Sequence, residues 1–123
     1  MSQDIISDTL NQIMNAKKAG KKEIVVTRYS RLLLKILDLA KENGYLSYEI
    51  EGKTLKIIIE NLNEIKSIKP RYSVQVKQID KYVRRFLPAK NFGFVIISTN
   101  KGLMKTKEAE EQNLGGCLVA YLF

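Results

Sequence analysis

The stretch that most constrains the fold lies near the C-terminal end of the 123-residue chain, over residues 94–116. Residues 94–97 are apolar and are β-branched or aromatic, which is typical of a buried strand. Three hydrogen-bonding side chains follow directly: Ser98, Thr99 and Asn100. Lys101-Gly102 then predicts a turn. We therefore expect a rigid strand to present a loop of small polar side chains.

The residues after this loop predict a short helix and a close backbone approach. Residues 105–112 are rich in helix formers, and Thr106 is a candidate N-cap. Asn113 is expected to end the helix, because Asn tolerates the left-handed conformation that helix C-termini use. Gly115-Gly116 allows the backbone to pass close to a neighbour before a last strand over residues 117–122. Polar side chains and bare backbone are thus expected to lie together.

Taken alone, the Ser-Thr-Asn segment also fits an ordinary connection in which hydroxyls and an amide satisfy nearby backbone groups. The charge distribution favours a binding role. Residues 71–107 hold nine Lys or Arg and one acid, Asp80, whereas the rest of the chain holds twelve of each sign. The whole net charge of +8 therefore lies in the segment that contains the loop. Such a concentration of positive charge is expected for a polyanion partner.

Periodicity predicts an αβαβββ order in the first part of the chain. The elements are a helix over 4–17, a strand over 23–28, a helix that Ser30 opens and Asn43-Gly44 closes, a hairpin over 45–51 and 54–59, and a third strand over 65–68. Four lysines follow the first helix: Lys17, Lys18, Lys21 and Lys22. Cations complement a helix C-terminus, but four of them exceed what the helix dipole needs.

The second part begins at Lys69-Pro70, because proline and the residue before it favour extended backbone. We expect a strand over 72–76, a basic helix over 78–87 closed by Pro88, and the strands and short helix around the polar loop. The outward residues of the basic helix are Lys81, Arg84 and Arg85, which also fit a solvated helix face. The predicted class is α+β, with an N-terminal αβ lobe over 1–69 and a C-terminal mixed β-sheet lobe with short helices over 70–123.

Composition excludes several functions. The chain has no histidine, which removes the commonest metal ligand and the commonest general base, so we expect no metal and no cofactor. No apolar run approaches the ~20 residues that span a bilayer, and no secretory leader is evident, so a cytoplasmic location is expected. The one cysteine, Cys117, lies in an apolar run that predicts a buried thiol.

The spacing of these motifs resembles small-subunit ribosomal protein family eight. The resemblance rests on Ser98-Thr99-Asn100-Lys101-Gly102-Leu103-Met104, then Glu108-Ala109, then Gly115-Gly116 and a strand that ends on aromatic residues. Ile68-Lys69-Pro70-Arg71-Tyr72 and Phe86 to Gly93 resemble the archaeal and eukaryotic-cytosolic branch of that family. The chain departs from the family pattern at three positions: Asn100, Lys105 and Asn113.

The resemblance implies a structural constituent of the small ribosomal subunit that binds the central domain of its RNA and supports its assembly. Its partners would be small-subunit RNA and neighbouring small-subunit proteins, with no membrane and no small-molecule substrate. The residues expected to bind RNA are Ser98, Thr99, Asn100, Lys101, Gly102, Gly115, Gly116, Arg71, Tyr72, Arg84, Arg85, Lys90, Asn15, Lys17, Lys18, Lys21 and Lys22. Short polar side chains suit the shallow minor groove of RNA, and the cations suit phosphate.

Two other classes of function compete with this interpretation. An RNA-processing enzyme would need a phosphate-binding Gly-rich loop, a carboxylate cluster or a cofactor motif, none of which the sequence contains. A DNA-binding module could use the N-terminal half, but its second helix is too apolar for a recognition helix. The sequence therefore predicts a protein that is not an enzyme, and the alternative is an RNA-processing enzyme or another non-ribosomal nucleic-acid-binding module.

Overall fold

The computed structural model describes residues 5–68, 73–89 and 92–123. The chain divides into two compact units, residues 1–66 and 67–123. Each unit combines helices with an antiparallel arrangement of strands, so the predicted α+β class is confirmed. The expected lobe boundary at Lys69-Pro70 lies outside the described residues.

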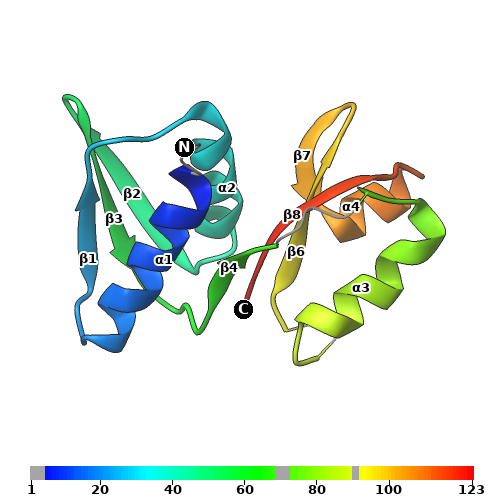
Figure 1. The fold of residues 1–123 in the computed structure, drawn as a ribbon, viewed down its shortest axis with the longest axis horizontal. Coiled ribbons are helices and arrows are strands. Elements are labelled where there is room, and N and C mark those ends of the chain that lie inside the picture. Colours follow the sequence, from blue (N-terminus) through cyan, green and yellow to red (C-terminus); the bar gives the residue numbers. More distant parts are fainter. Residues whose placement is uncertain (1–4, 69–72, 90–91) are drawn as a thin grey trace. The chain divides into compact units, whose positions relative to one another are not determined.

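The first unit contains two helices and a three-stranded antiparallel sheet (Figure 1). In chain order its elements are α1 (Ile5–Lys18), β1 (Glu23–Val26), α2 (Arg31–Glu42), β2 (Leu46–Glu51) and β3 (Thr54–Ile59). The strand order is β1-β3-β2, which leaves β1 and β2 at the two edges. Both helices cover the same face of this sheet (Figure 1).

Local signals fix the limits of α2. The Ser30 hydroxyl accepts a hydrogen bond from the Leu33 N–H at 3.2 Å, as expected of an N-cap. At the other end Gly44 adopts a φ of 79°, and the Tyr45 N–H donates to the Ala40 carbonyl at 3.0 Å. The buried stripe of α2 contains Leu33, Ile36, Leu37 and Ala40. Each large side chain buried in this way contributes roughly 1.5–3 kcal/mol.

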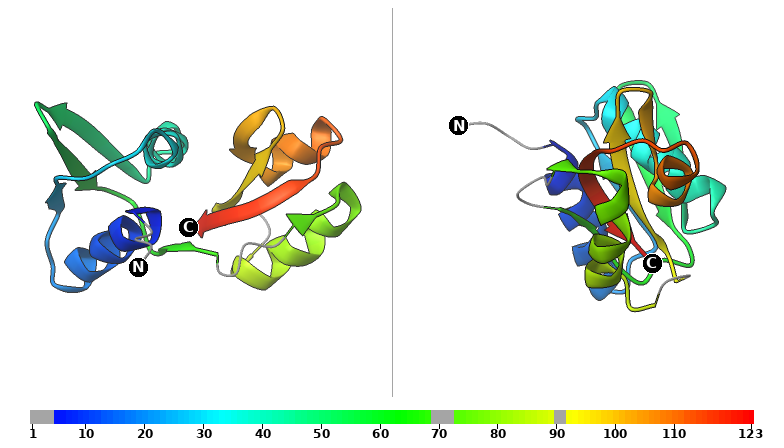
Figure 2. Two further views of the ribbon diagram at one scale, coloured as in Figure 1. Left: turned by 45° about the horizontal axis from the view of Figure 1, so that its top comes forward. Right: turned by 90° about the vertical axis from the view of Figure 1, so that its right-hand side faces the viewer.

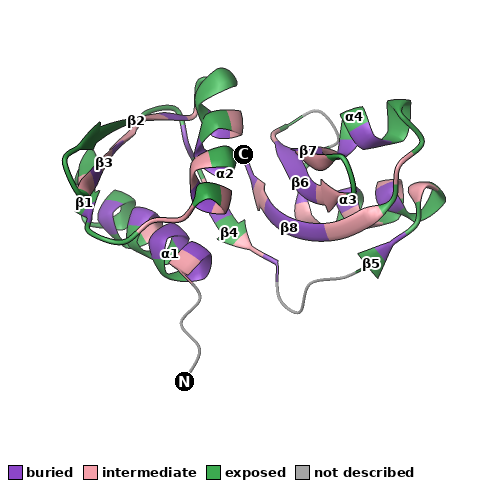
Figure 3. Ribbon diagram, turned by 90° about the horizontal axis from the view of Figure 1, so that it is seen from above, coloured by how far each residue is buried: buried purple, intermediate pink, exposed green. Residues whose placement is uncertain are grey.

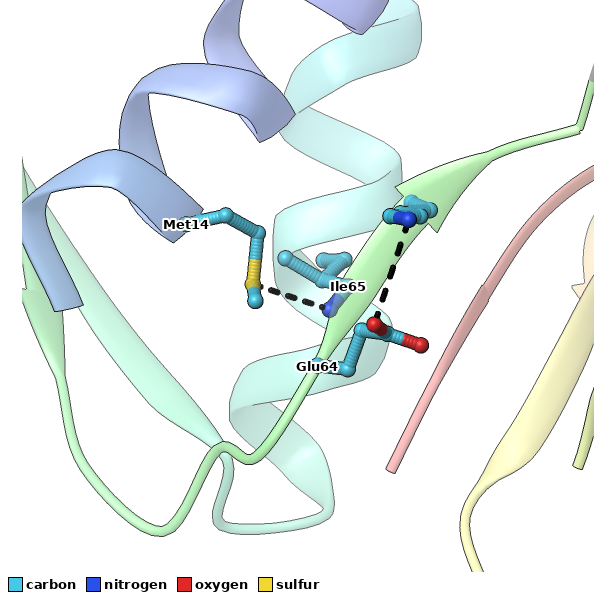
Figure 4. A network of polar contacts seen from close by, with 4 residues as sticks. Met14, Glu64 and Ile65 are labelled. Atoms are coloured by element: carbon cyan, nitrogen blue, oxygen red, sulfur yellow. Dashed lines mark hydrogen bonds and ion pairs between the residues drawn. The ribbon is translucent and has the colours of Figure 1, made fainter. Parts of the chain in front are cut away.

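Strand β4 (Ile65–Ser67) belongs to a different sheet from the one predicted. It pairs with β8 in the second sheet and does not extend the first. Its first residue is held by α1, because the Ile65 N–H donates to the Met14 thioether at 3.3 Å (Figure 4). Just beyond it, the Ile68 N–H donates to the Val119 carbonyl at 2.9 Å. Periodicity indicates a strand but cannot name its partner, which explains the wrong assignment.

The second unit is built around strands β6 and β8. In chain order its remaining elements are β5 (Ser73–Val74), the 3₁₀ turn η1 (Val76–Gln78), α3 (Ile79–Phe86), β6 (Phe94–Thr99), β7 (Gly102–Lys105), α4 (Thr106–Glu111) and β8 (Gly116–Leu122). The sheet order is β4-β8-β6-β7, and β5 also pairs with β8. The strand predicted over 72–76 is shorter than expected, because η1 begins at Val76.

The core of the second unit lies between this sheet and its two helices (Figure 2). Val95 and Ile97 of β6 point to one face and pack with Ile79 and Val83 of α3 and with Ala109 of α4. Strands β6 and β8 are mostly buried along their length, whereas the outer sides of the helices are exposed (Figure 3). Tyr82 and Phe86 of α3 are partly buried against the same cluster.

Strand β8 contains a β-bulge opposite the middle of β6. Ile96 pairs with Ala120, but the next residue, Ile97, pairs with Leu118. Val119 is therefore an extra residue in the ladder, and it is 2% exposed. The bulge places Val119 where its carbonyl accepts the Ile68 N–H.

Candidate nucleic-acid interface

The polar segment of the sequence forms a hairpin turn and not an open loop. Ser98 and Thr99 are the last residues of β6, and Asn100-Lys101 is a two-residue turn closed by the pair Thr99 and Gly102. Strand β7, which the sequence did not predict, continues from Gly102, whose φ is 113°. The sequence indicated a loop because β7 is only four residues long and is followed directly by α4, without a connecting segment.

Thr99 fixes the conformation of this turn. Its hydroxyl donates to the Gly102 carbonyl at 2.9 Å and accepts the Lys101 N–H at 3.1 Å. The donor capacity of Thr99 is therefore used within the protein, which leaves one lone pair of its oxygen for a ligand. Asn100 and Lys101 are exposed at the tip, and Ser98 is half-buried between Cys117 of β8 and Leu103 of β7.

The two glycines at the start of β8 lie against this turn and against β5. A Cβ atom on Gly116 would lie 2.9 Å from the Ser98 carbonyl carbon and 3.2 Å from the Thr99 Cα. A Cβ atom on Gly115 would lie 2.7 Å from the Val74 carbonyl oxygen and 3.3 Å from the Gln75 Cα. The shorter distance at each glycine is below 3.0 Å, which real Cβ atoms essentially never show, so the protein's own packing requires glycine at both positions. Gly115 remains exposed and Gly116 half-exposed.

Helix α4 follows the turn and ends as predicted. Asn113 takes a φ of 58°, and the Leu114 N–H donates to the Ala109 carbonyl at 2.8 Å. The predicted cap is wrong, however. Thr106 is the first residue of the helix and is buried, while Lys105 is the N-cap residue and makes no side-chain cap. Lys105 is the last residue of β7 and has extended backbone, so the helix begins directly after the strand at Thr106.

The cations of α3 lie on its exposed side. Lys81, Arg84 and Arg85 are all exposed, as the sequence predicted. Arg84 forms an ion pair with Asp80 at 3.0 Å, and the Arg85 guanidinium lies 5.4 Å from the centre of the Tyr82 ring. Arg85 is therefore held over an aromatic ring and keeps its donors for a ligand, whereas Arg84 is partly neutralised.

The predicted N-terminal residues gather at the C-terminal end of α1. Asn15, Lys17 and Lys18 are exposed on its last turn, and Lys21 and Lys22 are exposed just beyond Gly20. The Lys21 N–H donates to the Ala16 carbonyl at 2.9 Å, and Gly20 has a φ of 78°, so the chain folds back over the helix end. Because the helix C-terminus carries partial negative charge, the clustered lysines are compatible with it.

The predicted residues thus fall into separate groups. One group surrounds the β6–β7 turn, a second lies on α3, and a third lies at the end of α1 in the other unit. Arg71, Tyr72 and Lys90 lie outside the described residues. Sequence reasoning missed Val74-Gln75, which contacts Gly115, although the Gly-Gly pair itself signalled a close approach.

Three further features bear on expectations from the sequence. The sequence predicted a buried thiol at Cys117, but the residue is only half-buried. It pairs with Ser98, at the end of the β6–β8 ladder nearest the turn. Among the described residues, no group of His, Cys, Asp and Glu is arranged to hold a metal ion. Within the same residues, none of the helices is long and apolar enough to traverse a membrane.

A basic α+β fold with a polar hairpin turn defines a class of candidate RNA-binding proteins, and comparison with known proteins identifies the family. Residues 4–123 match the family model described as Ribosomal protein S8. The chain is 38% identical to a protein of Nanoarchaeum equitans and 37% identical to one of Archaeoglobus fulgidus, in each case over the whole of both chains. A protein of Thermoplasma acidophilum is 36% identical, again over both full chains. All three are named small ribosomal subunit protein uS8.

The chain therefore belongs to the ribosomal protein S8 family. This confirms the resemblance seen in the sequence, including its archaeal character. Since the family consists of structural ribosomal proteins, the chain is not an enzyme.

Proposed function

We propose that this chain is a cytoplasmic structural protein of the small ribosomal subunit, where it binds the central domain of the small-subunit RNA and supports its assembly. Family membership over nearly the whole chain supports the ribosomal role. Neighbouring small-subunit proteins are its further partners. Residues 70–123 form the lobe that binds this RNA, and the N-terminal lobe makes additional contacts.

The observation that carries the RNA-binding proposal is the geometry of the β6–β7 turn. Thr99 holds the turn in one conformation, and the bare backbone of Gly116 packs against Ser98 and Thr99. Asn100 and Lys101 are consequently exposed at a fixed position with no bulky neighbour on β8. A small, ordered surface of this kind suits the shallow minor groove of RNA, where 2′-hydroxyls and base edges are accessible.

The proposal divides the remaining residues by role. Ser98, Thr99 and Asn100 contact 2′-hydroxyls or base edges, together with the backbone of Gly102, Gly115 and Gly116. Lys101, Arg84, Arg85 and Lys90 neutralise phosphates, and Arg71 and Tyr72 also contact the RNA. Asn15, Lys17, Lys18, Lys21 and Lys22 contact a neighbouring RNA segment through the N-terminal lobe. Phosphate contacts position a protein on RNA, whereas contacts to bases and sugars provide specificity.

The decisive experiment is chemical footprinting of small subunits assembled with and without this chain. We expect protection at one helix of the central domain. Repeating the measurement with Asn100→Ala and Lys101→Ala should remove protection at the few nucleotides that the turn contacts and leave the rest. Protection confined to another domain, or unchanged by both substitutions, would contradict the proposal. Assembly should be followed separately by sedimentation, so that lost incorporation is not mistaken for lost contact.

A further inference from the structure

Strand β1 has one edge that no other described strand covers. It pairs with β3 alone and lies at the margin of the first sheet, next to α1 (Figure 1). Uncovered strand edges present unpaired N–H and C=O groups, which other chains can use. Natural proteins usually protect such edges with proline, a bulge or a covering element. Residues 23–26 contain no proline, and Val25 is 59% exposed.

The register of β1 shows which backbone groups point outward. The Ile59 N–H donates to the Lys22 carbonyl at 2.8 Å, so the pair Lys22 and Ile59 is a hydrogen-bonded pair. Hydrogen-bonded and non-hydrogen-bonded pairs alternate along an antiparallel ladder. Ile24 and Val26 therefore also direct their backbone groups towards β3. Glu23 and Val25 direct theirs away from the sheet.

This outward edge borders a groove between α1 and β1. The groove consists of two adjoining hollows of about 330 and 600 Å³, both of which are lined by Gln12 of α1 and Val25 of β1. The larger hollow reaches Lys21 and Glu23, and the smaller one reaches Thr27. The outward-facing residues of β1 thus line the groove along its whole length.

We propose that this groove binds an extended segment of a second protein, which pairs with β1 as an added strand. An extended polypeptide is the ligand whose N–H and C=O groups match those of Glu23 and Val25 in spacing, with strands about 4.8 Å apart. The exposed Val25 side chain favours a β-branched or aromatic residue opposite it on the added strand. This inference does not depend on how the β6–β7 turn binds RNA.

A second copy of the same chain fits the groove less well. If two copies paired antiparallel about Val25, Lys22 of each would lie opposite Arg28 of the other. Like charges directly opposite one another destabilise a strand pair. RNA also fits this edge less well, because it has no alternating N–H and C=O groups to pair with Glu23 and Val25. The carboxylates of Asp8 and Glu23 also offset the positive charges of Arg28 and Lys21 along the groove.

The test uses assembled small subunits that contain this chain with p-benzoylphenylalanine in place of Gln12. Gln12 is exposed on α1 and lines both hollows, so the photoreactive group will contact any ligand in the groove. We expect light to crosslink the chain to another protein. A crosslink to RNA, a crosslink to a second copy, or no crosslink in subunits that contain the variant would each overturn the proposal.

Proline substitutions connect the crosslink to strand pairing. Val25→Pro removes an N–H that faces the groove, so we expect the protein to fold and enter subunits but to lose at least nine-tenths of the crosslink. Ile24→Pro removes an N–H that faces β3 and should instead destabilise the first unit. A crosslink that persists in the Val25→Pro variant would show that the ligand does not pair with β1.

Amide hydrogen exchange of the unmodified protein provides a measurement that needs no variant. In the free protein, the amides of Glu23 and Val25 should exchange rapidly, while those of Ile24 and Val26 should be protected. In assembled subunits, the exchange of Glu23 and Val25 should slow by at least ten-fold. Unchanged exchange of these two amides would overturn the proposal even if RNA binding by the chain is intact.

Discussion

The two hairpin turns of the protein are stabilised by the same kind of hydrogen bond but differ in their surroundings. In the first unit, Gly52-Lys53 joins β2 to β3, and the Thr54 hydroxyl donates to the Glu51 carbonyl at 2.8 Å. In the second unit, Asn100-Lys101 joins β6 to β7, and the Thr99 hydroxyl donates to the Gly102 carbonyl at 2.9 Å. In both cases a threonine of the closing pair bonds across the turn. That bond is therefore a structural feature of the turn and is not itself a sign of RNA binding.

The difference between the hairpins lies in what surrounds them. Nothing lies within 4 Å of a Cβ atom added to Gly52, whereas the second turn is in tight contact with Gly116 of β8. The closing pair of the first turn also includes an acid, Glu51. Under the proposed function, contact with the neighbouring strand and an uncharged Asn100 are the two features that would allow the second turn, and not the first, to discriminate among ligands.

The largest effect is expected from Gly116→Ala. The added methyl group would overlap the Ser98 backbone, so we expect the free energy of unfolding to fall by about 3 kcal/mol, measured by urea denaturation. The matched change in the first unit is Gly52→Ala, which meets open space but keeps a φ of 61°. It should cost roughly 1–2 kcal/mol, from the left-handed conformation alone. Equal losses in the two variants would remove the proposed difference in packing.

Thr99→Ala and Thr54→Ala separate structural from binding roles. Each removes a similar hydrogen bond to a carbonyl, and Thr99→Ala also removes the bond that its hydroxyl accepts from the Lys101 N–H. The free energy of unfolding should therefore fall by about 1 kcal/mol for Thr54→Ala and by roughly 1–2 kcal/mol for Thr99→Ala. Thr99→Ala should also weaken binding to central-domain RNA by on the order of 1–3 kcal/mol, by analogy with base contacts. Thr54→Ala should leave binding unchanged. Filter binding with cognate and scrambled RNA would measure this, and an equal loss on both RNAs would assign the turn a purely structural role.

Asn100→Ala sharpens the same comparison without touching the turn's hydrogen bond. The Asn100 side chain is exposed, so the free energy of unfolding should change by less than about 0.5 kcal/mol. Binding to cognate RNA should weaken by roughly 1–2 kcal/mol, while the dependence of affinity on salt stays the same. A changed salt slope would indicate that the substitution alters phosphate contacts.

Charge reversal at Arg85 should affect all RNA alike. Arg85→Glu is expected to weaken binding to cognate and scrambled RNA by a similar factor. It should reduce the slope of log K against log salt by roughly 0.7–0.9. Arg84→Glu provides the matched control, and its effect should be smaller because Asp80 already pairs with Arg84. Selective loss of cognate binding would instead assign Arg85 to sequence recognition.

The smallest effect concerns Tyr48 in the first arm of the β2–β3 hairpin. Its hydroxyl donates to Asp38, and this bond, with burial, raises the pKa of Tyr48 to about 12. Because the folded protein favours the protonated phenol, the stabilisation is complete below pH 10 and is lost as the pH rises towards 12. Tyr48→Phe should cost about 0.5 kcal/mol at neutral pH and abolish this dependence without affecting RNA affinity. Unfolding measured from pH 9 to 12 would test it.

The sequence predicted those elements whose signals are local. Ser30 and Asn113 lie where caps are needed, and the run of β-branched and aromatic residues over 94–97 predicted the central strand correctly. The partner of β4 and the existence of β7 depended on contacts between distant residues. For the candidate site, the Gly-Gly pair predicted a close approach, but only the structure shows that Ser98 and Val74 are what it approaches.

The bulge at Val119 determines where this chain can change in length. Along β8, adjacent residues point to opposite faces, so losing one residue elsewhere in the strand would move Tyr121 or Leu118 to the wrong face. Val119 is the one position whose deletion would restore a regular ladder with β6 and keep every other side chain on its own side. Such a deletion would still remove the Val119 carbonyl, which accepts the hydrogen bond from the Ile68 N–H. Losing this one residue would therefore preserve the pairing of β6 with β8. It would, however, remove a hydrogen bond that holds Ile68, at the start of the second unit.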